Sequence, residues 1–231
     1  MIGKSSVAIT DALEADKVAG GGVFVHFDNI SGKKAEVYVD TEVHNSGKRT
    51  RTVAVETVLV DAGDVPVKRV SQQVKLQAGE SKTVRQRFAV RNPKLWSPDS
   101  PYLYRIQSRV KAGHEVLDGG VTRVGIRKAE FKGKDGFWLN GKPFGQLVGA
   151  NRHQDFAYVG NALPNSQQWR DAKRLRDAGC TIIRVAHYPQ DPAFMDACDE
   201  MGLFVIVLLR DGNIGIKIRS SQSWYIGIPV R

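Results

Sequence analysis

Two segments decide the fold: residues 146–155, with the sequence QLVGANRHQD, and residues 181–189, with the sequence TIIRVAHYP. Each is a short apolar run that ends in a polar cluster with an arginine and a histidine. Between them, residues 165–178 carry apolar side chains three positions apart, which indicates a helix. A strand, a helix and a strand, with polar groups at the carboxyl ends of both strands, are typical of a parallel sheet in a (β/α) barrel or a doubly wound fold.

The same pattern continues towards the C-terminus. Asp191 and Pro192 are a helix N-cap and a first helical residue, and Gly202 ends the helix that they begin. In the preceding helix, Asn165 or Ser166 is the expected N-cap. Residues 203–207 form a continuous apolar run, which predicts a third buried parallel strand.

After residue 207 the pattern stops. Residues 208–231 show no helical period and no clear strand and turn spacing, so we expect a tail that does not belong to the barrel pattern, as a frame shift or a truncation would produce. About three βα units are present, whereas a closed barrel has eight strands. An open sheet leaves an apolar edge, so we expect this tail or another chain to cover it.

The first half predicts a different architecture. From residue 22 to residue 127, about seven short segments alternate apolar and polar residues, and turn signals separate them. This spacing is typical of an immunoglobulin-like β-sandwich. Residues 95–98 (LWSP) interrupt the alternation, and we expect Trp96 to pack against the sandwich; a platform for a sugar is the alternative. Residues 131–144 (FKGKDGFWLNGKPF) predict a hairpin that leads into the second half.

The predicted fold is therefore an immunoglobulin-like β-sandwich followed by an incomplete (β/α)8 TIM barrel. We place the sandwich at residues 1–127, the N-terminal part of the barrel at 128–207 and the tail at 208–231.

Composition narrows the class of protein. A hydrophobic content of 42% and a charged content of 25% are typical of soluble globular chains, and no apolar run is long enough for a membrane span. No signal peptide is recognised, so a cytoplasmic location is the default for this chain, with a periplasmic or secreted complete parent as the alternative. The net charge of +10 is spread along the chain without a nucleic-acid-binding motif, which favours a solvated basic surface. The two cysteines, Cys180 and Cys198, lack metal-site spacing and are expected to be buried free thiols.

Several ordered motifs resemble glycoside hydrolase family 2, which contains β-galactosidases, β-glucuronidases and β-mannosidases. The motifs are Asn151-Arg152-His153, RVAHYP at 184–189 and CDEMGL at 198–203, with support from LWSP at 95–98, VGIR at 124–127 and FWLNGKP at 137–143. The resemblance covers residues 5–207 and suggests a β-galactosidase-like enzyme. It implies hydrolysis of O-glycosidic bonds with two glutamates, one as the general acid and one as the nucleophile.

The resemblance also implies roles for individual residues. Arg184 resembles the arginine that positions the nucleophilic glutamate, the alternative being an ion pair that stabilises the barrel end. His153 and His187 resemble histidines that hydrogen-bond sugar hydroxyls. Asn151 and Arg152 are expected to support the barrel mouth. Asp155 binds a hydroxyl or caps its loop, and both options stay open.

In the family, both catalytic glutamates lie on later barrel strands, the fourth and the seventh. We therefore expect no catalytic glutamate in this chain and no glycosidase activity from the chain alone. We expect neither a cofactor nor a metal site; the partner of a complete enzyme would be a β-galactoside-like carbohydrate, with no nucleic acid and no membrane. The alternative is a non-catalytic binding or assembly module that forms a homo-oligomer through the exposed barrel edge.

Overall fold

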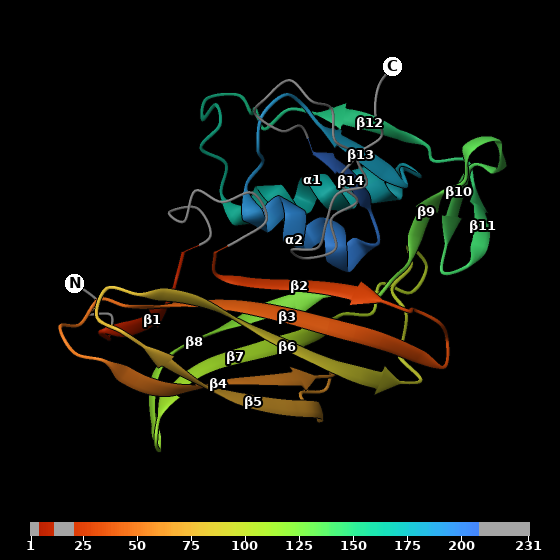
Figure 1. The fold of residues 1–231 in the computed structure, drawn as a ribbon. Helices are drawn as coiled ribbons and strands as arrows, with labels where there is room; N and C mark the ends of the chain where they lie inside the picture. Colours follow the sequence, from red (N-terminus) through yellow and green to blue (C-terminus); the bar gives the residue numbers. More distant parts are fainter. Residues whose placement is uncertain (1–4, 12–20, 208–231) are drawn as a thin grey trace. The chain divides into compact units, whose positions relative to one another are not determined.

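A computed structural model describes residues 5–11 and 21–207, which lie in two compact units (Figure 1). The first unit comprises the segments Met1–Pro93 and Tyr104–Val124, and the second comprises Lys94–Leu103 and Gly125–Arg231. The chain thus leaves the first unit after Pro93, contributes ten residues to the second and returns at Tyr104. The predicted tail at 208–231 lies outside the described residues.

The first unit is built from two antiparallel sheets (Figure 1). The β3 sheet contains β1 (Val7–Ile9), β2 (Val23–Asp28), β3 (Lys34–Asn45) and β6 (Ser81–Arg91), and β3 pairs with each of the other three strands. The β4 sheet contains β4 (Arg51–Val60), β5 (Pro66–Leu76), β7 (Tyr104–Ala112) and β8 (Glu115–Val124) in the order β5-β4-β7-β8.

A valine-rich core joins the two sheets face to face. Val43 and Val84 from the β3 sheet pack with Val53, Val55 and Val110 from the β4 sheet, and all five are at least 97% buried. The alternation seen in the sequence therefore places one side of each strand in this core. The predicted β-sandwich is confirmed, with β1 as a strand that the sequence pattern did not reveal.

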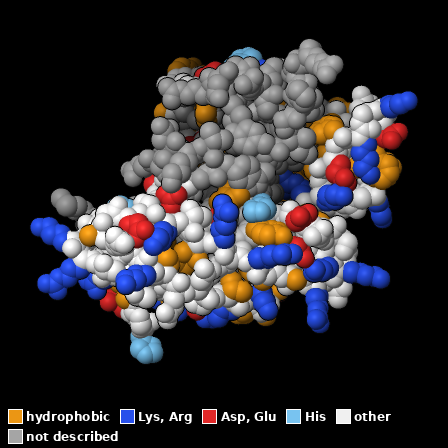
Figure 2. Space-filling model, in the orientation of Figure 1, with side chains coloured by type: hydrophobic (Ala, Val, Ile, Leu, Met, Phe, Trp, Pro, Cys, Tyr) orange, Lys and Arg blue, Asp and Glu red, His pale blue; other side chains and the backbone are white. Residues whose placement is uncertain are grey.

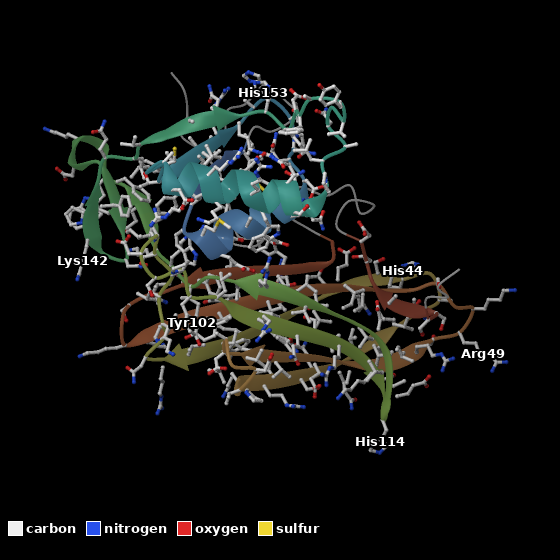
Figure 3. All side chains as sticks on the ribbon, turned by 180° about the vertical axis from the view of Figure 1, so that it is seen from behind. His44, Arg49, Tyr102, His114, Lys142 and His153 are labelled. Carbon is white, nitrogen blue, oxygen red and sulfur yellow. The ribbon has the colours of Figure 1, made fainter. Side chains whose placement is uncertain are left out.

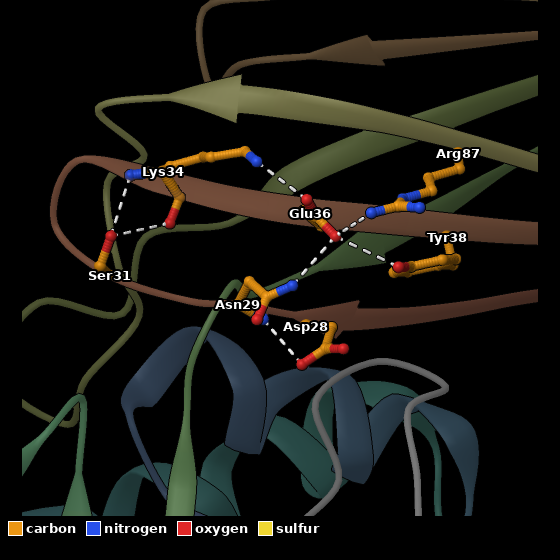
Figure 4. Close-up of polar contacts among 7 residues, drawn as sticks. All are labelled: Asp28, Asn29, Ser31, Lys34, Glu36, Tyr38 and Arg87. Atoms are coloured by element: carbon orange, nitrogen blue, oxygen red, sulfur yellow. Dashed lines mark hydrogen bonds and ion pairs between the residues drawn. The ribbon is translucent and has the colours of Figure 1, made fainter.

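One polar cluster lies on the outer face of the β3 sheet (Figure 4). The Glu36 carboxylate accepts hydrogen bonds from Lys34 Nζ (2.8 Å), Arg87 Nη2 (2.6 Å), Asn29 Nδ2 (3.1 Å) and Tyr38 Oη (3.2 Å). These donors, Lys34 first, lower the pKa of Glu36 to about 2. On the same face, Asp40 pairs with Arg85 at 3.3 Å.

The second unit contains a three-stranded parallel sheet with two helices. Its strands β12 (Gly149–Arg152), β13 (Ile182–Val185) and β14 (Phe204–Val207) lie in that order and alternate along the chain with α1 (Asn165–Asp177) and α2 (Pro192–Met201). Both helices cover one face of the sheet (Figure 1). The predicted strand, helix and strand order is confirmed, although β12 begins two residues later than the apolar run at Leu147 indicated.

The helix ends agree with their sequence signals in one case and differ in the other. The Asp191 carboxylate accepts a hydrogen bond from Ala193 N (2.8 Å), and Gly202 ends α2 in the left-handed conformation, as predicted. In α1, by contrast, Pro164 occupies the N-cap position, so Asn165 is already the first helical residue and caps nothing.

A small antiparallel sheet precedes the parallel one. It contains β9 (Ala129–Phe131), β10 (Phe137–Leu139) and β11 (Lys142–Gly145), with a single 3-10 turn, η1 (Gly133–Asp135), before β10. Asn140 and Gly141 connect β10 to β11 with φ values of 53° and 80°, which fits the tight turn that the Asn-Gly pair predicts.

The prediction for Trp96 was wrong: it lies in the core of the second unit, not against the sandwich. The side chain is fully buried, its indole Nε1 donates to the carbonyl oxygen of Asp199 (2.8 Å), and its ring meets Phe204 edge-on at 5.3 Å. The guanidinium of Arg127 stacks 4.2 Å from the ring centroid. Full burial also excludes the alternative of a sugar platform. The error arose because chain proximity to the sandwich strands says nothing about which core a loop joins.

Among the described residues, no helix is both long enough and apolar enough to cross a membrane.

We expect Trp96→Ala to destabilise the second unit by about 3–5 kcal/mol, because it removes a buried ring and its hydrogen bond. Trp138→Ala is the matched control: its side chain is only half-buried and should cost about 1–2 kcal/mol. Hydrogen exchange of the α2 amides, followed by mass spectrometry, measures the difference. Equal loss of protection in the two variants would contradict the assigned role of Trp96.

Candidate functional site

The register of the parallel sheet determines which polar residues meet. Asn151 lies opposite Arg184, which lies opposite Ile206, whereas Arg152 lies opposite Val185. Because successive side chains on a strand point to opposite faces, Asn151 and Arg184 share one face, and Arg152 lies on the other. Asn151 and Arg152, which are consecutive in the sequence motif, therefore lie on opposite faces of the sheet.

On the face away from the helices, Arg184 forms a short polar row. Its Nη1 lies 3.4 Å from Asn151 Oδ1, and its Nη2 lies 3.3 Å from His187 Nδ1. A guanidinium can only donate hydrogen bonds, so His187 Nδ1 is the acceptor in this contact. The ring proton of His187 then lies on Nε2, where it is available to a hydroxyl or carboxylate oxygen of a ligand.

Aromatic side chains border this row. The His153 ring lies 5.5 Å from the His187 ring and 6.2 Å from the Tyr188 ring, edge-on in both cases. Both histidines are exposed, and His153 projects from the chain just after β12 (Figure 3). The Tyr188 hydroxyl accepts a hydrogen bond from Gln154 N (2.8 Å), which fastens the loop after β12 to the loop after β13.

Gln154 strengthens the same connection. Its Oε1 accepts a hydrogen bond from Asp191 N (2.8 Å), and its Nε2 donates to Asn161 O (3.1 Å). The loops that carry His153 and His187 are therefore tied together by Gln154 and Tyr188, two residues of the quoted segments to which the sequence analysis assigned no role. Asp155 lies exposed in the loop after β12.

Arg152 lies beneath the helices. Its guanidinium donates to Gln168 Oε1 (2.8 Å), Asp171 Oδ2 (2.8 Å) and Gln190 Oε1, and it stacks over Phe194 at 3.9 Å. The side chain is only 5% exposed. These contacts connect β12 to α1, α2 and the loop before α2, and they favour the supporting role expected for this residue.

Among the described residues, the Arg184 guanidinium contacts an amide and an imidazole. Half-buried and in contact with His187, Arg184 has donors suited to an anionic group. Residues 5–11 and 21–207 contain no group of three or more His, Cys, Asp or Glu side chains arranged to hold a metal ion. Cys198 is buried, which raises its thiol pKa, and Cys180 is partly buried; neither forms a disulfide.

Family models match both halves of the chain. The model for glycosyl hydrolases family 2 matches residues 22–127, and the model for the TIM barrel domain of that family matches residues 130–214. The chain therefore belongs to glycoside hydrolase family 2, with an immunoglobulin-like sandwich and part of a TIM barrel. The second match extends seven residues beyond the barrel segment expected from the sequence pattern.

The individual relatives that the chain matches carry the names of β-galactosidases and β-glucuronidases. The chain is 35% identical over 184 residues to a β-galactosidase of Thermoanaerobacter pseudethanolicus, and this match covers 79% of the chain and 24% of the relative. It is 36% identical to a putative β-glucuronidase of Formosa agariphila, over 76% of the chain and 20% of the relative. A family 2 structure from Bacteroides cellulosilyticus matches with a TM-score of 0.81 and 32% identity, over 90% of this chain and 26% of that one.

The chain thus spans about a quarter of the length of the relatives that it matches.

Arg152→Met and Arg184→Met form a matched pair on opposite faces of neighbouring strands. We expect Arg152→Met to destabilise the protein by about 3–5 kcal/mol, because it leaves Asp171 and two buried glutamines without their donor. Arg184→Met should cost less than about 1 kcal/mol, because its two contacts are long and solvent-exposed. Urea unfolding measures both. A larger loss for Arg184 would assign it to structure instead of ligand binding.

Proposed function

We propose that residues 146–190 form one wall of the sugar-binding site of a family 2 glycosidase. The row of Asn151, Arg184 and His187 at the carboxyl ends of parallel strands carries this proposal, since barrel enzymes place their active sites at that end. The domain division that we propose for the protein is a sandwich at 1–127, a barrel part at 128–207 and a tail at 208–231.

In this proposal each residue has one task. Arg184 holds the nucleophilic carboxylate ionised and oriented, because a nearby guanidinium favours the charged form of a carboxyl group. His187 donates from Nε2 to a sugar hydroxyl, and His153 binds a second hydroxyl from the neighbouring strand end. Asp155 contributes a further hydroxyl contact. Asn151 and Arg152 fix the strand that carries them.

The reaction that this wall would serve is retaining hydrolysis of a β-glycosidic bond. A glutamic acid protonates the leaving oxygen, and a second glutamate, about 5–5.5 Å away, attacks the anomeric carbon. We propose a β-galactoside as the substrate, supported by relatives named β-galactosidase; other relatives are named β-glucuronidase.

The 231-residue chain has no glutamate after Glu200. If the catalytic pair belongs to the fourth and seventh strands, as the family pattern implies, this polypeptide by itself does not hydrolyse glycosides. Its part in the reaction is to bind and position.

A chimera tests this assignment. Residues 22–207 replace the matching segment of the Thermoanaerobacter pseudethanolicus β-galactosidase, and turnover of 4-nitrophenyl β-galactoside is measured. We expect an active chimera in which Arg184→Gln lowers kcat on the order of 100-fold, because the nucleophile loses its alignment. Arg170→Gln, on the exposed surface of α1, is the control and should leave kcat unchanged.

Two results would contradict the proposal: a folded chimera that is unaffected by Arg184→Gln, or turnover by the 231-residue chain alone at the rate of the complete relative.

The second candidate function is a non-catalytic assembly module, and the edges of the parallel sheet favour it. Within the described residues, β12 and β14 each pair only with β13, so each has one side without a strand partner. A second copy could extend the sheet there. Light scattering after size-exclusion chromatography should then give a dimer mass that Val148→Lys, next to β12, converts to monomer. A monomer at every concentration of the unmodified chain rules this candidate out.

A further inference from the structure

The outer face of the β4 sheet is more basic than its counterpart. Along β7, Tyr104, Ile106, Ser108 and Val110 are buried, so the residues between them point outwards. Those outward residues are Arg105, Gln107, Arg109 and Lys111. Val58 on β4 pairs with Arg69 on β5 and with Gln107 on β7. Residues opposite one another on neighbouring strands point to the same face, so Arg69 lies on the outward face with Gln107.

A single carboxylate organises three of these cations. Glu56 Oε2 lies 2.9 Å from Arg69 Nη1, and Glu56 Oε1 lies 2.9 Å from Lys111 Nζ and 3.8 Å from Arg109 Nη1. Lys111, and then Arg69, keep the pKa of Glu56 below its usual value, so this carboxylate stays charged at neutral pH. Three positive charges thus surround one negative charge.

The geometry leaves the positive groups facing solvent. The Glu56 side chain is 10% exposed, whereas those of Arg69 and Arg109 are 56% and 43% exposed. Gly119, which has no side chain, lies opposite Arg109 on β8. Lys and Arg side chains also project along the lower border of the sandwich in Figure 2.

The other sheet of the same sandwich is different. On the outer face of the β3 sheet, Glu36 meets Lys34 and Arg87, and Asp40 meets Arg85. Asp28 on β2 lies opposite Glu36. The carboxylates of Asp28, Glu36 and Asp40 therefore nearly balance the cations on that face. The excess positive charge of the β4 sheet is therefore a local property of that face and not of the whole sandwich.

We propose that the outer face of the β4 sheet binds an anionic polysaccharide whose charges are uronate carboxylates. The exposed guanidinium groups of Arg69 and Arg109 suit bidentate contacts with carboxylates. Ser71 and Gln107, opposite Glu56 and Val58, supply hydroxyl and amide groups between the cations, which suit sugar hydroxyls. This inference rests on the proposed glycosidase function, to which it adds a second contact with a charged glycan.

Two observations favour a glycan over a nucleic acid. The four strands β4, β5, β7 and β8 contain one aromatic residue, Tyr104, and that residue is buried. Stacking of bases on aromatic rings, the usual support for single-stranded nucleic acid, is therefore absent from the strand positions of this face. The relatives named β-glucuronidase also point to carbohydrate chemistry that includes a carboxylate.

The experiment is a titration of the full chain with fluorescent polygalacturonate at 50 and 150 mM NaCl. We expect binding that weakens with salt, because ionic contacts release counterions. Arg69→Gln together with Arg109→Gln should weaken binding at least 10-fold. Arg85→Gln with Arg87→Gln removes the same charge from the β3 sheet and should change binding less than 2-fold.

NMR provides a measurement without mutations. Addition of polygalacturonate should change the chemical shifts of backbone amides on β5 and β7. The inference is overturned if polygalacturonate does not bind at 50 mM NaCl, if the two charge-matched pairs of substitutions have equal effects, or if double-stranded DNA of equal charge binds as tightly. These measurements involve no turnover, so their failure leaves the glycosidase assignment intact.

Discussion

The parallel register that sets Asn151 opposite Arg184 is the constraint on which the candidate site depends. It places a polar amide beside the guanidinium and sends the adjacent Arg152 to the helix side, where that residue connects β12 to α1. Gly149 keeps the strands in this position, because a Cβ there would overlap the backbone of Ile182. A shift of β12 by one residue would move Arg152 from the dry core to the open face and Asn151 to the helix side.

The two ends of the parallel sheet have different chemistry. At the amino ends, Phe204 is enclosed by Trp96, Phe137 and Phe144, which contact it edge-on at 5.2–5.6 Å. At the carboxyl ends lie Arg184 and the two histidines. Apolar packing therefore stabilises one end and leaves the other free to hold polar groups with unused donors. This division is the one that barrel enzymes use to separate stability from function.

The two outer faces of the sandwich differ in charge balance although they share one core. Glu36 has two cationic partners and Asp28 lies opposite it, whereas Glu56 has three cationic partners. A local carboxylate that fixes several exposed basic groups gives them a defined arrangement, and such an arrangement favours a ligand over bulk solvent.

The sequence by itself determined the features that depend on residues close to one another along the chain. Period-two alternation gave the sandwich strands, the spacing of apolar residues gave α1, and Asp191 with Gly202 gave the ends of α2, because each signal lies within a few residues. Arg184, His153 and His187 were also predicted as site residues, since motifs in a fixed order along the chain carry them. Only the tertiary structure decided that Trp96 belongs to the second core and that Tyr188 and Gln154 tie the site loops together. Those contacts join residues distant in sequence, and neither alternation nor composition encodes them.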